Sequence, residues 1–102
     1  MALFQTQLGT SATTVFDPSA DSAVTTLFLC NTHSSAVTVT LYLINGSGTP
    51  DDTNAIWKDV SIASKDTFVM NNERIILAAA DFIKGLASVA SKVTVTGTYT
   101  TI

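Results

Sequence analysis

The residues that could do chemistry are few and lie apart in the chain. His33 is the only histidine, and Cys30 is the only cysteine. A metal site takes three or four protein ligands, and neither a second His nor a second Cys is present to help complete one. We therefore interpret His33 as a residue of a polar turn. Cys30 ends the apolar run Leu27-Phe-Leu-Cys, so we expect it to be a buried small hydrophobe.

The other candidates for chemistry lie in the polar segment 45–54. Asp51-Asp52 loosely resembles a calcium loop, but the late bidentate Glu of that motif is absent, so we expect a solvated loop tip. Gly46-Ser-Gly48 lacks the Lys of a phosphate-binding loop, and the chain has no G-x-S-x-G nucleophile motif. We therefore expect no catalytic residue, no metal and no cofactor, and the protein is predicted not to be an enzyme.

Trp57 is the only tryptophan, and its position leaves three interpretations open. Period-two alternation places Trp57 opposite Ile56 and Val60, on a polar strand face. It could anchor a protein interface, stack on a sugar together with Tyr42, or close one end of the domain.

The composition favours a surface that is covered by a partner. The chain has 102 residues, enough for one domain, and only 13% are charged, about half the usual share. The 17 Thr and 10 Ser supply the polar half of the pattern instead. Charged residues are depleted in interface cores, which fits a covered surface. The alternative is that Thr is present because it favours strands.

Charge and targeting signals argue against several classes of partner. The net charge is −3 and the five basic residues are scattered, so nucleic-acid binding is not expected. No apolar run approaches the roughly 20 residues that span a bilayer, and the N-terminus does not have the pattern of a signal peptide. A small domain without disulfides fits synthesis in a reducing compartment.

The hydrophobic pattern predicts strands throughout. Val93–Ile102 alternates almost strictly between apolar and hydroxyl residues, which indicates a half-buried strand. A strand with both faces buried is expected at 23–31, and one at 36–44 has Val37, Val39, Leu41 and Leu43 on one face. Further strands are expected at 55–62, 67–70, 74–77 and 82–88, with a turn at 71–74. Turn signals every 8–12 residues predict a single antiparallel β-sandwich, Ig-like or jelly-roll, with 7–9 strands over residues 1–102.

Residues 78–90 could instead form a helix, because Ala, Leu and Lys favour helices. A helix there would have no apolar stripe, and Gly85 would lie in its middle. We therefore predict a strand.

The N-terminal segment 1–16 has two possible roles. It carries Leu3, Phe4 and Leu8 and has no charged side chain. It is either one or two first strands of the sandwich or an arm that adds a strand to a neighbouring molecule. Leu3, Phe4, Leu8, Trp57 and Tyr42 are accordingly the interface candidates. Low charge and poorly guarded strand edges predict a homo-oligomer, with a trimer favoured.

Several segments together resemble a known group of proteins. They are Leu29-Cys-Asn-Thr32, Ala36-Val-Thr-Val-Thr-Leu-Tyr-Leu43, Val60–Val69, Ile76–Ile83, Leu86-Ala-Ser88 and Val93-Thr-Val-Thr-Gly97. Their order resembles small β-sandwich virion proteins of tailed bacteriophages, encoded among head and tail genes, over about residues 25–100.

The resemblance implies a non-enzymatic structural protein, made in the bacterial host cytoplasm and located in the virion. A capsid decoration or cement protein that binds the major capsid lattice is the interpretation we favour. The alternatives are a neck, collar or tail-fibre adaptor, which would contact neck or tail proteins, and a carbohydrate-binding module that uses Trp57 and Tyr42.

Overall fold

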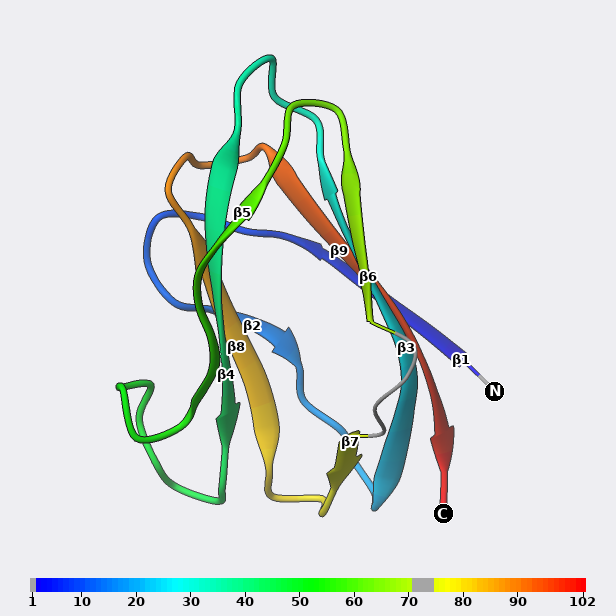
Figure 1. Cartoon of the computed structure of the whole chain (residues 1–102). Helices are drawn as coiled ribbons and strands as arrows, with labels where there is room; N and C mark the ends of the chain where they lie inside the picture. The colour runs from blue at the N-terminus through cyan, green and yellow to red at the C-terminus, as the bar shows by residue number, and fades with distance from the viewer. Residues whose placement is uncertain (1, 71–74) are drawn as a thin grey trace.

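The computed structural model of the chain describes residues 2–70 and 75–102, which form nine β-strands and no helix (Figure 1). The strands are β1 (Ala2–Gln7), β2 (Thr13–Phe16), β3 (Ser22–Asn31), β4 (Val37–Ile44), β5 (Ala55–Ile62), β6 (Thr67–Met70), β7 (Ile75–Leu77), β8 (Phe82–Ala87) and β9 (Val93–Thr101). The turn predicted at 71–74 lies outside the described residues.

The strands form two antiparallel sheets that pack face to face. Sheet A has the order β1-β9-β3-β6, and β7 also pairs with β3, further along the same side. Sheet B has the order β2-β8-β4-β5. When β6 and β7 are counted as one interrupted edge strand, this is the double Greek-key order of a jelly roll. The predicted β-sandwich is confirmed, and the strand order favours its jelly-roll form over the Ig-like one.

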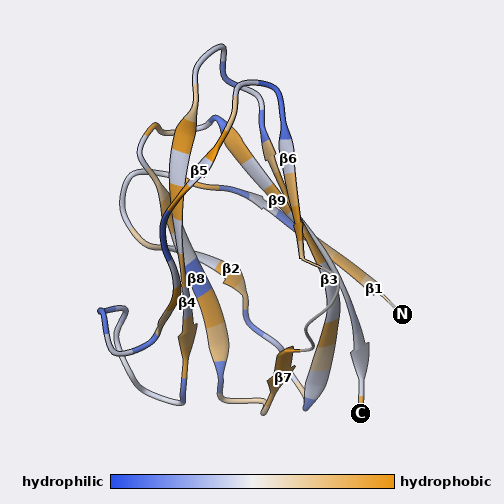
Figure 2. Ribbon diagram, viewed as in Figure 1, coloured by the Kyte–Doolittle hydropathy of each residue, from blue (hydrophilic) through white to orange (hydrophobic). Residues whose placement is uncertain are grey.

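The core lies between the sheets and follows the period-two pattern of the strands. Its buried side chains come from both sheets: Val24, Leu27, Leu29, Val93 and Val95 from sheet A, and Val37, Val39, Leu41, Ile62 and Ile83 from sheet B. In Figure 2 apolar residues run along the strands, whereas hydrophilic residues gather mainly in the connecting loops. The strand predicted in place of a helix at 78–90 is confirmed as β8, between β2 and β4.

Asn31 ties the two sheets together at one end of the sandwich. It is the last residue of β3, and its side chain is completely buried. Its Nδ2 group donates to the carbonyl oxygens of Ser35, Ile62 and Ala63, at 3.0, 2.9 and 3.2 Å. Its Oδ1 accepts from the backbone N–H of His33 at 2.8 Å. One amide side chain therefore joins sheet A to the end of β5 and orders the turn that contains His33.

The expectation that residues 27–30 of β3 are buried on both faces is wrong. Leu27 and Leu29 are completely buried, but Phe28 is 39% exposed and Cys30 is half-buried. These two residues point to the outer face of sheet A, whereas the core lies on its other side. Cys30 is therefore not the buried hydrophobe that its apolar neighbours predict.

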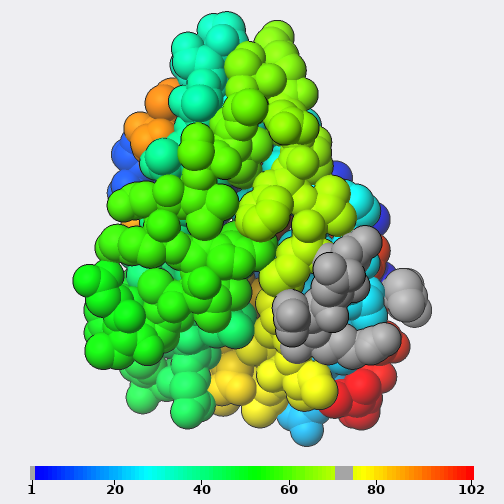
Figure 3. Space-filling view, viewed as in Figure 1, coloured from blue at the N-terminus to red at the C-terminus, as the bar shows by residue number. Residues whose placement is uncertain are grey.

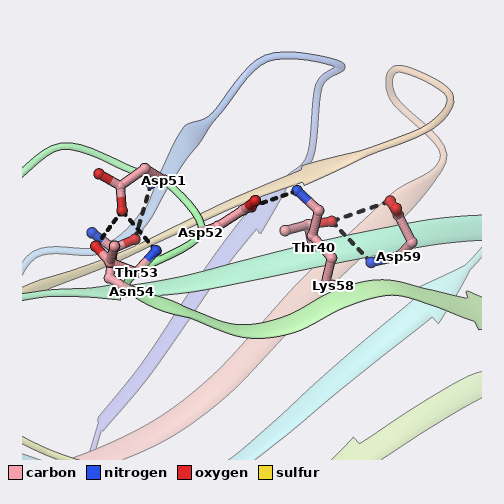
Figure 4. Close-up of polar contacts among 7 residues, drawn as sticks. All are labelled: Thr40, Asp51, Asp52, Thr53, Asn54, Lys58 and Asp59. Carbon is pink, nitrogen blue, oxygen red and sulfur yellow. Dashed lines mark hydrogen bonds and ion pairs between the residues drawn. The ribbon is translucent and has the colours of Figure 1, made fainter.

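A β-bulge in β5 reverses the predicted side of Trp57. Val39 pairs with Val60 and Leu41 with Trp57, so two residues, Lys58 and Asp59, lie opposite Thr40. The Thr40 hydroxyl accepts from the backbone N–H of Asp59 at 3.1 Å, and Asp59 has a φ of 51° (Figure 4). Because of the extra residue, the strand residues before Lys58 lie on the opposite sides of the sheet from those that a regular alternation with Val60 and Ile62 predicts.

Trp57 therefore lies on the core side with Ile62, and its ring is 4.8 Å from that of Phe68. A second irregularity, between Leu41 and Tyr42, accompanies the burial of Tyr42, which is only 7% exposed. The prediction that Trp57 lies on a polar outer face is wrong. Tyr42 keeps its predicted side of β4, opposite Leu41, because β4 pairs with β8 without a break from Val39 to Ile44, but it is covered rather than open.

Candidate interaction surface

Sheet A differs from sheet B in charge. The five strands of sheet A contain no Asp, Glu, Lys or Arg. All the charged strand residues lie in sheet B, as Lys58 and Asp59 of β5 and Lys84 of β8. The absence of charge from one whole sheet is the most distinctive surface property of the described residues.

The outward side chains of sheet A form one surface, which we call the uncharged face. The register places them in rows across four strands. They are Leu3, Gln5 and Gln7 of β1, Thr94, Thr96 and Thr98 of β9, Thr26, Phe28 and Cys30 of β3, and Thr67 and Val69 of β6. A central band of hydroxyl groups on β9 thus has Leu3 and two amide side chains on the β1 side, and Phe28, Cys30 and Val69 on the other side.

Large apolar side chains are exposed on and beside the uncharged face. Leu3 is 58% exposed, Val69 42% and Phe28 39%. Ile76 of β7, which pairs with Ala23, is 67% exposed. Phe28 and Val69 lie directly opposite each other and form one apolar patch, whereas Leu3 lies across the strand β9 from them. Grouped exposed apolar residues are typical of surfaces that bind a partner, whereas single ones are ordinary.

Part of the hydrogen-bonding capacity of this sheet is already used within it. Gln5 Nε2 donates to the Thr96 hydroxyl at 3.1 Å, across β1 and β9. The hydroxyls of Thr25 and Thr98 lie 2.6 Å apart, next to an irregularity in β3. Polar groups that are paired with one another lose less when water is removed, so such a surface can be covered at low cost.

The charged side of the molecule has a different character. Figure 3 shows the edge of the sandwich at which β5 and β6 lie, where residues from about 45 to 70 cover most of the view. Lys58 Nζ lies 2.8 Å from Asp52 Oδ1, and this ion pair raises the pKa of Lys58 (Figure 4). Asp51 accepts hydrogen bonds from the hydroxyl and the backbone N–H of Thr53, and these contacts lower the pKa of Asp51.

The carboxylates of Asp51 and Asp52 thus have partners within their own loop and strand. In the part of the chain that the structure describes, no three His, Cys, Asp or Glu side chains gather as a metal site would require. His33 lies in the turn after β3, where its carbonyl oxygen accepts from the Ser64 hydroxyl at 3.1 Å.

A small open cavity of about 150 Å³ lies between the end of β4 and β7. Leu43, Ile44, Ile76 and Leu77 line it together with Asp81. The Asp81 carboxylate accepts from the backbone N–H groups of Gly46 and Ala78, at 3.1 and 3.0 Å. Both oxygens therefore hold loops together, so the one charged side chain among the described lining residues is already engaged.

The five interface candidates have different positions in the fold. Leu3 is exposed on the uncharged face, but Leu8 is 1% exposed and Tyr42 7%, so both belong to the chain's own interior. Phe4 points inward and stacks on Phe16 with ring centroids 4.4 Å apart, and Trp57 packs against the core. Leu8, Tyr42 and Trp57 therefore present little or no surface to a partner.

Sequence reasoning missed Phe28, Val69 and Gln5 as surface residues. Their signal was present, because each occupies the outward position of a period-two strand. The sequence analysis expects Phe28 in a strand buried on both faces, whereas the core lies on one side of sheet A only.

No family model, no curated protein and no solved structure matches the sequence. None of the described residues forms a helix with the length and hydropathy needed to cross a membrane.

Proposed function

We propose that this protein is a non-enzymatic structural component of a phage virion and that it packs the uncharged face of sheet A against a repeating protein surface. A capsid decoration protein on the head lattice is the form of this function that we favour. The observation that carries the proposal is the absence of charge from all five strands of sheet A, combined with exposed Leu3, Phe28 and Val69.

The energetic argument rests on what an interface must remove from water. Burial of apolar surface contributes about 25 cal/mol per Å², whereas burial of an unpaired charge is costly. A partner that covers the uncharged face would bury apolar surface without burying a charge. A single small contact would be weak, but many copies on a lattice, linked to one another, bind far more tightly than one.

The adaptor alternative uses the same surface at a neck, collar or tail fibre, so the two functions differ in copy number rather than in chemistry. The carbohydrate-binding alternative needs Trp57 and Tyr42 on an open face. Because Tyr42 is buried and Trp57 packs against Phe68, nothing in the sheet geometry supports it.

The test compares one charge placed on each sheet. Thr96→Lys puts a cation at the centre of the uncharged face, and Ser61→Lys puts the same cation on an exposed position of β5. Each variant, shown to be folded by circular dichroism, is mixed with particles of the encoding phage that lack the protein, and the bound fraction is measured by sedimentation.

We expect Thr96→Lys to lose binding by at least tenfold, whereas Ser61→Lys binds like the unmodified protein. Equal binding of both variants, or no binding of the unmodified protein, would contradict the proposal. Quantitative mass spectrometry of intact particles then separates a lattice copy number from that of a ring.

A further inference from the structure

The four edges of the two sheets differ in how well they are protected against pairing with another strand. The β2 edge has four residues and an irregularity between Thr14 and Phe16. The β5 edge carries the bulge at Asp59 and the exposed cation of Lys58. The edge of sheet A opposite β1 consists of two short strands, β6 and β7. Bulges, charges and short strands are the devices that prevent edge-to-edge pairing.

The β1 edge has none of these devices. Its six residues keep an unbroken register with β9 from Ala2 to Gln7. It contains no charged residue and no proline, and Leu3, Gln5 and Gln7 are exposed. Among the described edges, β1 is therefore the regular and unguarded one.

The hydrogen bonds at the end of β1 show which of its backbone groups are free. The N–H of Leu8 donates to the carbonyl oxygen of Val93 at 2.9 Å, so Leu8 directs its backbone groups toward β9. Because backbone direction alternates along an antiparallel strand, Thr6 and Phe4 also face β9. The N–H and C=O groups of Leu3, Gln5 and Gln7 therefore point away from the sheet.

We infer that β1 pairs with β1 of a second copy of this chain, antiparallel and centred on Gln5, to form a dimer with a two-fold axis. In that register Gln5 lies opposite Gln5 of the second copy, and Leu3 lies opposite Gln7. Every outward backbone group of these three residues then has a partner on the other strand, as strand addition requires. The inference does not depend on the virion proposal.

The side chains fit the same register. Directly opposite residues of an antiparallel pair lie on one face, so Leu3, Gln5 and Gln7 extend the uncharged face across both copies. On the inner side Phe4 lies opposite Thr6. No charged side chain is brought together, which matters because each chain carries a net charge of −3. An isologous contact of this kind closes on itself and leaves no further β1 edge open.

The first test uses the fact that position 5 meets itself. Gln5→Lys and Gln5→Glu each place like charges directly opposite one another, which is destabilising in an antiparallel pair. Light scattering after size exclusion, at micromolar concentration, should show the unmodified protein as a dimer and each variant alone as a monomer. An equimolar mixture of the two variants should restore the dimer, because opposite charges then meet. Ser61→Lys is the matched control and should remain dimeric.

A monomeric or trimeric unmodified protein would overturn the inference. So would a dimer that both single variants leave intact, or a mixture of the two variants that stays monomeric.

A second test depends on the backbone alone. Proline removes an N–H group and is tolerated on an edge strand only where that group faces solvent. Gln5→Pro should therefore give a folded monomer, whereas Thr6→Pro, which removes a bond to β9, should unfold the domain. If either variant is ambiguous, Gln5→Cys in a Cys30→Ser background should cross-link to a covalent dimer with a short bismaleimide. Failure to cross-link would contradict the pairing.

Discussion

Phe4 of β1 and Gly97 of β9 lie directly opposite each other, and the Phe4 ring occupies the space that a side chain at position 97 would need. A Cβ atom at position 97 would lie 2.6 Å from Cε1 and 2.7 Å from Cε2 of that ring. The ring stacks on Phe16 and lies 6.2 Å from Tyr99, so it cannot move without disturbing other aromatic side chains.

Gly97→Ala should therefore destabilise the domain by about 1–3 kcal/mol, the usual cost of overpacking. In a Phe4→Ala background the same substitution should have little effect, because the clash is removed. Urea unfolding of the four proteins in this cycle measures the coupling. Equal effects of Gly97→Ala in both backgrounds would mean that the Phe4 ring does not constrain position 97.

Leu41→Ala should reduce the free energy of unfolding by about 2–5 kcal/mol, the range for emptying a buried aliphatic site. Leu41 is completely buried, so its truncation leaves a cavity in the core that water does not fill. The matched control is Ile76→Ala at a position that is 67% exposed, where the change should stay within about 0.5 kcal/mol. Denaturant unfolding that gives similar losses for both would contradict the assigned core.

Asn31→Leu should reduce the free energy of unfolding by about 1–3 kcal/mol or more, because a buried polar group left without a partner carries a penalty of that size. The substitution keeps the size of the side chain but leaves the carbonyl oxygen of Ile62 without its donor. Thr32→Val is the control, because the hydroxyl of Thr32 bonds to Lys92 at an exposed site. Thermal unfolding that ranks the control as the more damaging change would argue against Asn31 as the tie between the sheets.

Thr53→Val should raise the pKa of Asp51 toward its ordinary value of 3.8. The Thr53 hydroxyl is the largest cause of the lowered pKa, because it donates to the ionised carboxylate. A carboxyl whose pKa is lowered in the folded state stabilises that state at pH values above the pKa of the unfolded chain. This stabilisation is lost as the pH falls through the pKa of the folded state. Carboxyl-carbon NMR titration gives the pKa, and Thr49→Val serves as the control. An unchanged Asp51 titration in Thr53→Val would contradict this assignment.

The strands could be predicted from the sequence because period-two patterning is local. Val93–Thr101 alternates so regularly that both its position and its buried face follow from the residues. Gly85 likewise argued against a helix at 78–90, and in the fold a Cβ atom at this position would lie 3.1 Å from Cδ1 of Leu41, a tight contact.

The faces of β5 could not be predicted, because they depend on the bulge at Asp59. A bulge is set by the partner strand, here through the Thr40 hydroxyl, and nothing in residues 55–62 alone indicates it. The low charge of the chain indicated that an uncharged surface would exist. The location of that surface could not be predicted, because it depends on which distant strands pair within one sheet.

The central position of β9 in sheet A has a consequence for biosynthesis. β9 pairs with β1 on one side and with β3 on the other, and these two strands do not pair with each other. A ribosome must therefore complete residues 93–101 before either strand can pair with β9, and Gln5 and Thr96, which bond in the folded chain, are 91 positions apart. β3 can pair earlier with β6 and β7, but β1 has β9 as its only neighbour in sheet A. Because pairing between distant segments forms slowly, β1 gains its strand partner only after translation has passed β9.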